Sequence, residues 1–231
     1  MAIDFSKYSA PKIKPLPVIL LLDTSGSMLG DKIANLQSAV EDMVATFIAQ
    51  ESKEIKIQLA VITFGENVNF LWKNPIYVPV RDVQIPRMDA KGSTPMGTAI
   101  TAAKDVIEDK DTTHDCKLPV VVLVSDGRPN DEWREPLNQF ISGGKSQRCQ
   151  RFALAIGADA DRNVLKMFTQ NEENVLYAND AKDIADRFRL ISMTISSQAH
   201  SGRATGTQVN PSWNAAPSQS MNNFDDDDPM F

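Results

Sequence analysis

A run of apolar residues that ends at an aspartate constrains the fold of this chain more than any other feature. The run is Pro17–Leu22, and the sequence Asp-Thr-Ser-Gly-Ser follows it directly. Five or six consecutive apolar residues predict a strand buried on both faces, as in a parallel sheet. In open α/β sheets, ligands bind at the carboxyl ends of such strands. Asp23, Ser25 and Ser27 are therefore expected at a binding edge, where Gly26 allows a tight turn that points them the same way.

The side chains of this stretch offer only oxygen atoms. One carboxylate and two hydroxyls are hard ligands, which suit Mg²⁺, Mn²⁺ or Ca²⁺, and no soft ligand stands nearby to favour zinc or copper. Aspartate, serine and glycine also fill ordinary turns, so this stretch alone is a weak indicator of a metal site.

Two further segments match the first. Lys91–Gly97 (Lys-Gly-Ser-Thr-Pro-Met-Gly) is a loop that opens a helix, and Thr94 is its candidate ligand. Val120–Val124 is a second fully apolar strand, followed by Ser-Asp-Gly, so Asp126 stands at a strand end just as Asp23 does.

In order and separation, the three segments resemble the metal-ion-dependent adhesion site of von Willebrand factor A domains, and the resemblance covers about residues 15–197. It implies that a divalent cation, Mg²⁺ with Mn²⁺ or Ca²⁺ as alternatives, is held at five matching positions: Asp23, Ser25, Ser27, Thr94 and Asp126. The serine hydroxyls would contact the ion directly, Thr94 directly or through water, and the carboxylates largely through bridging waters. One coordination position would stay open for an Asp or Glu of a partner protein, which implies metal-dependent protein binding.

Strand and helix patterns alternate along the chain. This alternation predicts a doubly wound α/β fold, with a mostly parallel sheet and helices on both faces. The resemblance implies one antiparallel edge strand, for which Asn67–Trp72 is the candidate, while Val78–Ile85 stays ambiguous because it contains a proline. Three parts are expected: an N-terminal arm at residues 1–14, the A-type domain at 15–197, and a disordered polar tail at 198–231.

The composition excludes several functional classes. The 231 residues include 24 basic and 30 acidic side chains, a net charge of −6, so no direct binding to nucleic acid or to a membrane is expected. The N-terminus lacks the apolar core of a signal peptide, and the two cysteines, Cys116 and Cys149, lack metal-ligand spacing. These features predict a cytoplasmic protein with reduced thiols.

An enzyme was weighed as the alternative. A magnesium-dependent hydrolase or phosphatase commonly uses Asp-x-Asp, but here Ser25 stands where the second acid would be. Gly26–Lys32 has the wrong spacing for a phosphate loop. The two histidines, His114 in a charged loop and His200 near the tail, suggest no nucleophile–base pair. A non-enzymatic binding module is therefore expected.

Among A domains, the chain resembles the bacterial TerY-type proteins of tellurite-resistance and stress operons. The resemblance rests on a minimal single domain and on the sequences Leu-Leu-Leu-Asp-Thr-Ser-Gly-Ser-Met, Gly-Ser-Thr-Pro-Met-Gly and Ser-Asp-Gly-Arg-Pro-Asn-Asp-Glu-Trp. It implies a scaffold in phospho-signalling, with a protein kinase and a protein phosphatase as partners. The long polar tail departs from the minimal pattern.

The C-terminal segment carries a second motif. Phe224 precedes four aspartates at 225–228, and Pro229, Met230 and Phe231 follow. This resembles the acidic tip of bacterial single-stranded-DNA-binding proteins, although Met230 is inserted before the last Phe. The resemblance implies a tail-mediated partner that accepts Phe231 in an apolar pocket. The alternatives are a solvated acidic tail, or an aspartate run that blocks the metal site of a neighbouring copy.

Overall fold

The computed structural model describes residues 13–201. Most of the arm predicted at residues 1–14 lies outside this range. The same is true of most of the tail predicted from residue 198, and of its acidic tip.

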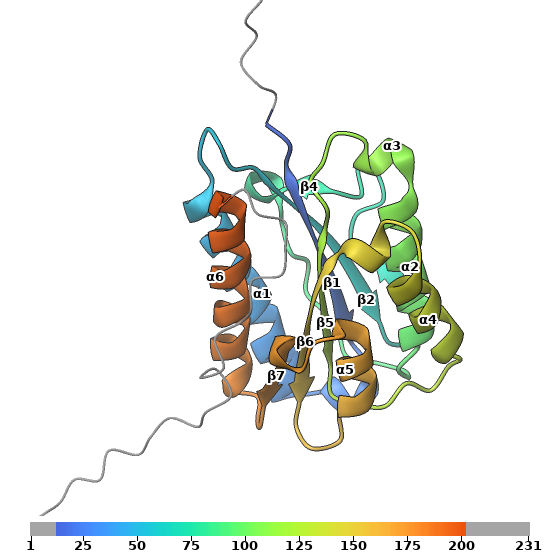
Figure 1. Cartoon of the computed structure of the whole chain (residues 1–231). Coiled ribbons are helices and arrows are strands. Elements are labelled where there is room, and N and C mark those ends of the chain that lie inside the picture. The colour runs from blue at the N-terminus through green and yellow to red at the C-terminus, as the bar shows by residue number, and fades with distance from the viewer. Residues whose placement is uncertain (1–12, 202–231) are drawn as a thin grey trace, which may run out of the picture.

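One mixed sheet forms the centre of the protein (Figure 1). The strand order is β3-β2-β1-β5-β6-β7, and β4 also pairs with β2. The strands are β1 Leu16–Asp23, β2 Ile57–Phe64, β3 Val68–Phe70, β4 Val78–Pro79, β5 Val120–Ser125, β6 Gln150–Ile156 and β7 Val175–Ala178. All pairings are parallel except those of β3 and β4, which both run antiparallel to β2. The predicted fold class is confirmed, with the antiparallel position shared by two short strands.

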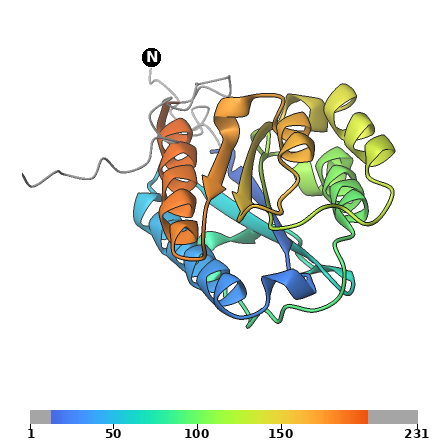
Figure 2. The same cartoon turned by 90° about the horizontal axis from the view of Figure 1, so that it is seen from below.

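Helices cover both faces of the sheet (Figure 2). They are α1 Asp31–Gln50, α2 Met96–Glu108, α3 Lys110–Thr113, α4 Arg134–Ser142, α5 Arg162–Thr169 and α6 Asp183–Ser201. Helices α1 and α6 pack on one face, and α2, α4 and α5 pack on the other. Along β1 the buried side chains alternate between these two cores, with Leu20 and Leu22 in the first and Ile19 and Leu21 in the second. A strand covered on both faces needs this apolar run.

Local sequence signals set the helix boundaries. In α1 the buried residues recur at helical spacing, including Leu36, Val40 and Phe47. Asp161 caps α5, since its carboxylate accepts hydrogen bonds from the backbone N–H groups of residues 163 and 164. The last helix begins after Asp180, whose carboxylate accepts from the backbone N–H groups of residues 182 and 183.

Two features of composition were followed into the structure. Both cysteines are free, and Cys149 is buried. Within residues 13–201, none of the helices has the length and apolar character that crossing a membrane requires.

Candidate metal centre

The ends of β1 and β5 form the base of the site. These neighbouring strands are parallel and pair Leu22 with Val124, so Asp23 and Ser125 finish side by side at one edge of the sheet. The Ser125 hydroxyl donates a hydrogen bond to Asp23 Oδ2 at 2.6 Å. Both side chains are fully buried. The register of two apolar strands therefore fixes one oxygen of the first predicted ligand.

A single 3-10 turn, Gly26–Met28, carries the two serines. The backbone N–H of Ser25 donates to Asp23 Oδ1 at 2.8 Å, and the hydroxyls of Ser25 and Ser27 lie 3.0 Å apart. Gly26 N–H donates to the carbonyl of Gly92 at 2.9 Å, which ties this turn to the loop of Thr94. The turn thus brings two hydroxyls to the same edge as the Asp23 carboxylate.

Asp126 completes the acidic part of the site. Its side chain is buried, and its Oδ1 accepts a hydrogen bond from the Ser27 hydroxyl at 2.7 Å. Its Oδ2 accepts from the ammonium of Lys32 at 2.5 Å, and the Lys32 side chain is one-third exposed. The second strand-end aspartate therefore meets the serine turn on one side and a cation on the other.

Thr94 lies in the loop that leads into α2. Its backbone N–H donates to Asn130 Oδ1, and its carbonyl accepts from the N–H of Asn130, both at 3.1 Å. A Cβ atom added to Gly127 would lie 3.6 Å from the Thr94 hydroxyl and 3.9 Å from that of Ser27. These distances place the Thr94 hydroxyl beside Ser27 at the glycine that follows Asp126. All five predicted residues are thus brought together.

The start of α2 is held by Asp131. Its Oδ1 accepts from the backbone N–H of Gly97 at 2.9 Å, and its Oδ2 accepts from the backbone N–H of Thr98 at 2.8 Å and from the Thr98 hydroxyl at 2.9 Å. These contacts satisfy N–H groups that a helix terminus leaves without partners. Asp131 therefore fixes the helix behind Thr94, and its oxygens already have partners.

Burial makes the Asp23 carboxylate costly to ionise. Desolvation raises the pKa of Asp23 above its usual range, and the charge of Asp126 adds to that effect. Hydrogen bonds from Ser125 and Ser25 oppose the rise without cancelling it. A nearby positive ion would offset this cost, because opposite charge favours the ionised form.

The donor set fits a hard divalent cation. Two carboxylates and three hydroxyls provide only oxygens, as Mg²⁺, Mn²⁺ and Ca²⁺ prefer. Among residues 13–201 there is no group of three or more His, Cys, Asp or Glu side chains that could hold a metal by themselves. The hydroxyls are therefore an essential part of the proposed ligand set.

Three residues at the site were not predicted. Ser125, Lys32 and Asn130 contact Asp23, Asp126 and Thr94, respectively. Ser125 could have been suspected, because it is the strand residue directly before Asp126. Nothing in the local pattern distinguishes Lys32 from other lysines on a helix surface.

The comparisons with known proteins agree with this fold. The family model of the von Willebrand factor type A domain matches residues 18–189, which is most of the chain. The chain belongs to the von Willebrand factor type A domain family. Human inter-alpha-trypsin inhibitor heavy chain H6 is 23% identical over 188 residues, which cover 74% of this chain and 14% of that relative. The chain spans only a small part of the length of such curated relatives.

Solved structures with the same fold come from distant relatives. A von Willebrand factor type A structure from Catenulispora acidiphila has a TM-score of 0.61 at 16% identity, covering 80% of this chain and 43% of that one. Proximal thread matrix protein 1 from the mussel byssus, with a zinc-occupied MIDAS motif, has a TM-score of 0.58 at 18% identity, covering 78% and 48%. At these identities the likeness shows the A-domain fold.

Proposed function

We propose that this A domain binds partner proteins through a divalent cation held at the edge of its sheet. Asp23, Ser25, Ser27, Thr94 and Asp126 would hold the ion, with Mg²⁺ as the first candidate and Mn²⁺ or Ca²⁺ as alternatives. An Asp or Glu of the partner would fill the remaining coordination position. The cation supplies the charge that attracts this carboxylate.

The convergence of two buried carboxylates and three hydroxyls carries the proposal. Asp23 and Asp126 come from different strands, yet the serine turn joins them through short oxygen contacts. Burying two like charges without a cation is unfavourable, and proteins retain such arrangements mainly where they bind something. The zinc-occupied MIDAS of the mussel protein supports a metal at the corresponding motif.

The proposed role is binding without catalysis. His114 is exposed and pairs with the neighbouring Asp115 at 3.4 Å. Burial raises the pKa of the Cys149 thiol to about 12, so this cysteine is a poor nucleophile at neutral pH. Neither residue has a contact with the metal centre among the interactions of the described residues.

The TerY-type resemblance extends the proposal to a class of partner. A scaffold in stress or phospho-signalling would present its metal edge to a protein kinase or a protein phosphatase. An acidic side chain on such a partner meets the requirement of the open coordination position. The partner's own catalytic activity would then account for any phosphatase activity that copurifies.

A paired experiment tests the function. The full chain is immobilised, and candidate kinase and phosphatase partners are passed over it in Mg²⁺ and in EDTA, beside the Asp23→Asn variant. Binding that requires Mg²⁺ and is lost in the variant supports the proposal. Binding that is equal in EDTA contradicts it, and Mg²⁺-dependent phosphatase turnover by the purified chain would favour the hydrolase alternative.

A further inference from the structure

An apolar groove lies beside the metal centre. It has a volume of about 700 Å³ and runs between the start of α1 and the loop at residues 87–90. Its apolar lining residues are Leu29, Ile33, Ala34, Met88 and Ala90. Leu29 is 73% exposed, although it follows the proposed ligand Ser27 by only two residues. A large exposed apolar side chain beside a polar site is typical of a binding surface.

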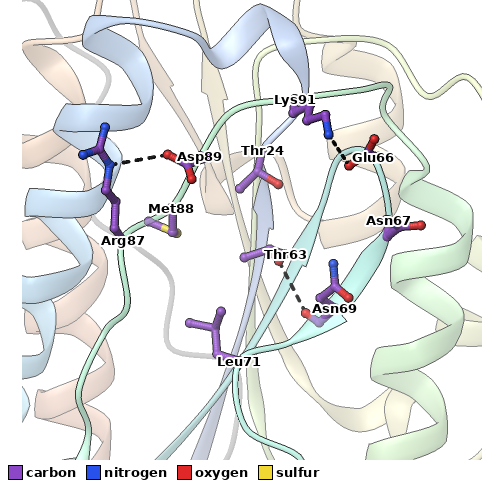
Figure 3. A pocket seen from close by; sticks show the side chains of 10 residues that line it. All are labelled: Thr24, Thr63, Glu66, Asn67, Asn69, Leu71, Arg87, Met88, Asp89 and Lys91. Carbon is purple, nitrogen blue, oxygen red and sulfur yellow. Dashed lines mark hydrogen bonds and ion pairs between the residues drawn. The ribbon is translucent and has the colours of Figure 1, made fainter.

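A second, polar hollow of about 240 Å³ adjoins the same loop (Figure 3). Two ion pairs stand at its rim, Arg87 with Asp89 at 3.4 Å and Lys91 with Glu66 at 2.8 Å. Figure 3 shows them on either side of Thr24, the residue after Asp23. Arg87 lines both hollows, and its side chain is 90% exposed. The edge therefore combines the metal centre, an apolar groove and exposed cations.

The C-terminal segment of this chain has the complementary chemistry. Asp225–Asp228 are four consecutive carboxylates, with Phe224 directly before them and Met230 and Phe231 shortly after. Neighbouring Cα atoms are about 3.8 Å apart, so Ser27 and Leu29 are at most about 7 Å apart along the backbone. The adjacent pair Phe224–Asp225 spans a comparable length, which lets a ring enter the groove while a carboxylate meets the ion.

The last described helix ends at the opposite edge of the sheet. Lys117 donates from its side chain to the carbonyl of Ala199 at 3.4 Å and from its backbone to that of Pro15 at 2.9 Å, so the end of α6 lies near the start of β1 (Figure 1). The 19 residues of α6 rise by about 28 Å. A segment returning to the metal centre from Ser201 must therefore cross roughly 30 Å.

The connecting sequence has the right length for this return. Phe224 follows Ser201 by 23 residues, and a flexible linker of that length has a root-mean-square span of about 26 Å. When the span of a linker matches the distance between two sites, the effective concentration of the tethered group approaches its maximum, which is of millimolar order. A contact too weak to detect between separate molecules would be substantially populated within one chain.

We infer that Phe224–Asp228 is an intramolecular ligand of the metal centre, with one aspartate on the ion and the Phe224 ring in the groove of Leu29. This inference rests on the proposed metal-binding function. A partner carboxylate must displace the tail, so the tail weakens partner binding until the partner engages it or outcompetes it.

A labelled peptide of residues 220–231 tests the inference, with the full chain as its receptor. The receptor carries Asp225→Asn, Asp226→Asn, Asp227→Asn and Asp228→Asn, which removes the competing carboxylates but keeps the tail length. Fluorescence anisotropy should show saturable binding in Mg²⁺ that weakens at least about tenfold in EDTA, and about tenfold in a receptor that also carries Leu29→Ser. The wild-type chain should bind the peptide more weakly than the receptor, because its own tail competes. A peptide with four Asn in place of the four Asp is the matched control.

Calorimetry of Mg²⁺ with the same receptor separates the possible failures. If the receptor binds Mg²⁺ but no peptide, the tail inference is wrong and the metal-binding proposal stands. If it binds no Mg²⁺, both are wrong. Peptide binding that Leu29→Ser leaves unchanged overturns the groove assignment. A wild-type chain that forms Mg²⁺-dependent dimers, lost in the four-Asn variant, overturns the intramolecular form in favour of contact between copies.

Discussion

Two carboxylates at opposite ends of the protein are treated in opposite ways. Asp23 ends β1 at the metal edge, where burial raises its pKa. Glu108 ends α2 near the other edge, where partial burial would also raise its pKa. There the backbone N–H groups of Lys145 and Ser146, together with the Lys104 ammonium, reverse that effect and lower the pKa of Glu108 to about 2. Glu108 stabilises the fold when it is ionised, whereas Asp23 is a cost that a cation would offset.

The difference lies in what surrounds each group. Glu108 accepts hydrogen bonds from the N–H of Lys145 and of Ser146, both at 3.0 Å, and pairs with Lys104 at 3.4 Å. Asp23 also accepts two hydrogen bonds, but it is fully buried and its charged neighbour is Asp126. A carboxylate with a local cation is structural, and one held beside another carboxylate is prepared for an external cation.

The largest expected effect comes from Asp23→Asn. At a Mg²⁺ concentration of 100 Kd, the wild type should gain about 2.7 kcal/mol of unfolding free energy, and the variant should gain none. Without metal at neutral pH, the variant should be the more stable protein, because it lacks a buried charge. Denaturant unfolding with and without Mg²⁺ measures both.

The sign of the pH dependence provides a control for that variant. A raised folded-state pKa means that wild-type stability falls as the pH rises through the pKa of Asp23. The metal-free difference between the two proteins should therefore shrink as the pH is lowered through that pKa. A difference that stays constant with pH would show that ionisation of Asp23 is not its cause.

Asp131→Ala should be the next largest change. Asp131 also lies near the metal edge, but it caps the start of α2. Removing the cap should cost about 1–2 kcal/mol of unfolding free energy with and without Mg²⁺. Thermal unfolding checks this, and a loss confined to the Mg²⁺-bound protein would make Asp131 a metal ligand instead.

Glu108→Gln should destabilise the protein by about 1 kcal/mol at neutral pH, since it weakens hydrogen bonds to a charged acceptor. The lowered pKa means that the wild-type contribution is present above about pH 4.5 and is lost as the pH falls toward about 2. The two proteins should therefore converge in stability over that window. Urea unfolding across the window measures the convergence, and parallel profiles would contradict it.

Lys32→Met should have the smallest effect and the opposite direction for metal. The Lys32 ammonium bonds Asp126 Oδ2, so it competes with a cation for that oxygen. Removing a partly exposed ion pair worth about 0.5–1 kcal/mol should tighten Mg²⁺ binding by about two- to fivefold. Calorimetry measures the affinity, with Lys56→Met, on the exposed pair with Glu51, as the control. Weaker binding in Lys32→Met would show that the lysine supports the metal.

The sequence was most informative where one strong pattern left a single structural solution. The runs before Asp23 and Asp126 are wholly apolar, so both strands had to be buried and both aspartates had to reach the same edge. The loop of Thr94 was likewise marked by its glycines and proline. These three segments were enough to predict the fold class and to bring the five candidate ligands together.

Side-chain contacts between distant segments were out of reach. The Ser125–Asp23 bond joins residues 102 positions apart, and the Lys32–Asp126 pair joins residues 94 apart. Such pairs depend on strand register and on the direction of one helix, which no local pattern encodes. The segment Val78–Ile85 stayed ambiguous because β4 has only two residues, one of them Pro79, which gives too short a run for periodicity to appear.

Calorimetric titration of Mg²⁺ into three full-length proteins tests the central contrast most directly. They are the wild type, Asp126→Asn at the metal edge and Glu108→Gln at the opposite end. We expect one saturable site in the wild type, the same site in Glu108→Gln, and no binding in Asp126→Asn. Unchanged binding in Asp126→Asn, or no binding in the wild type, would contradict the assignment of the metal centre.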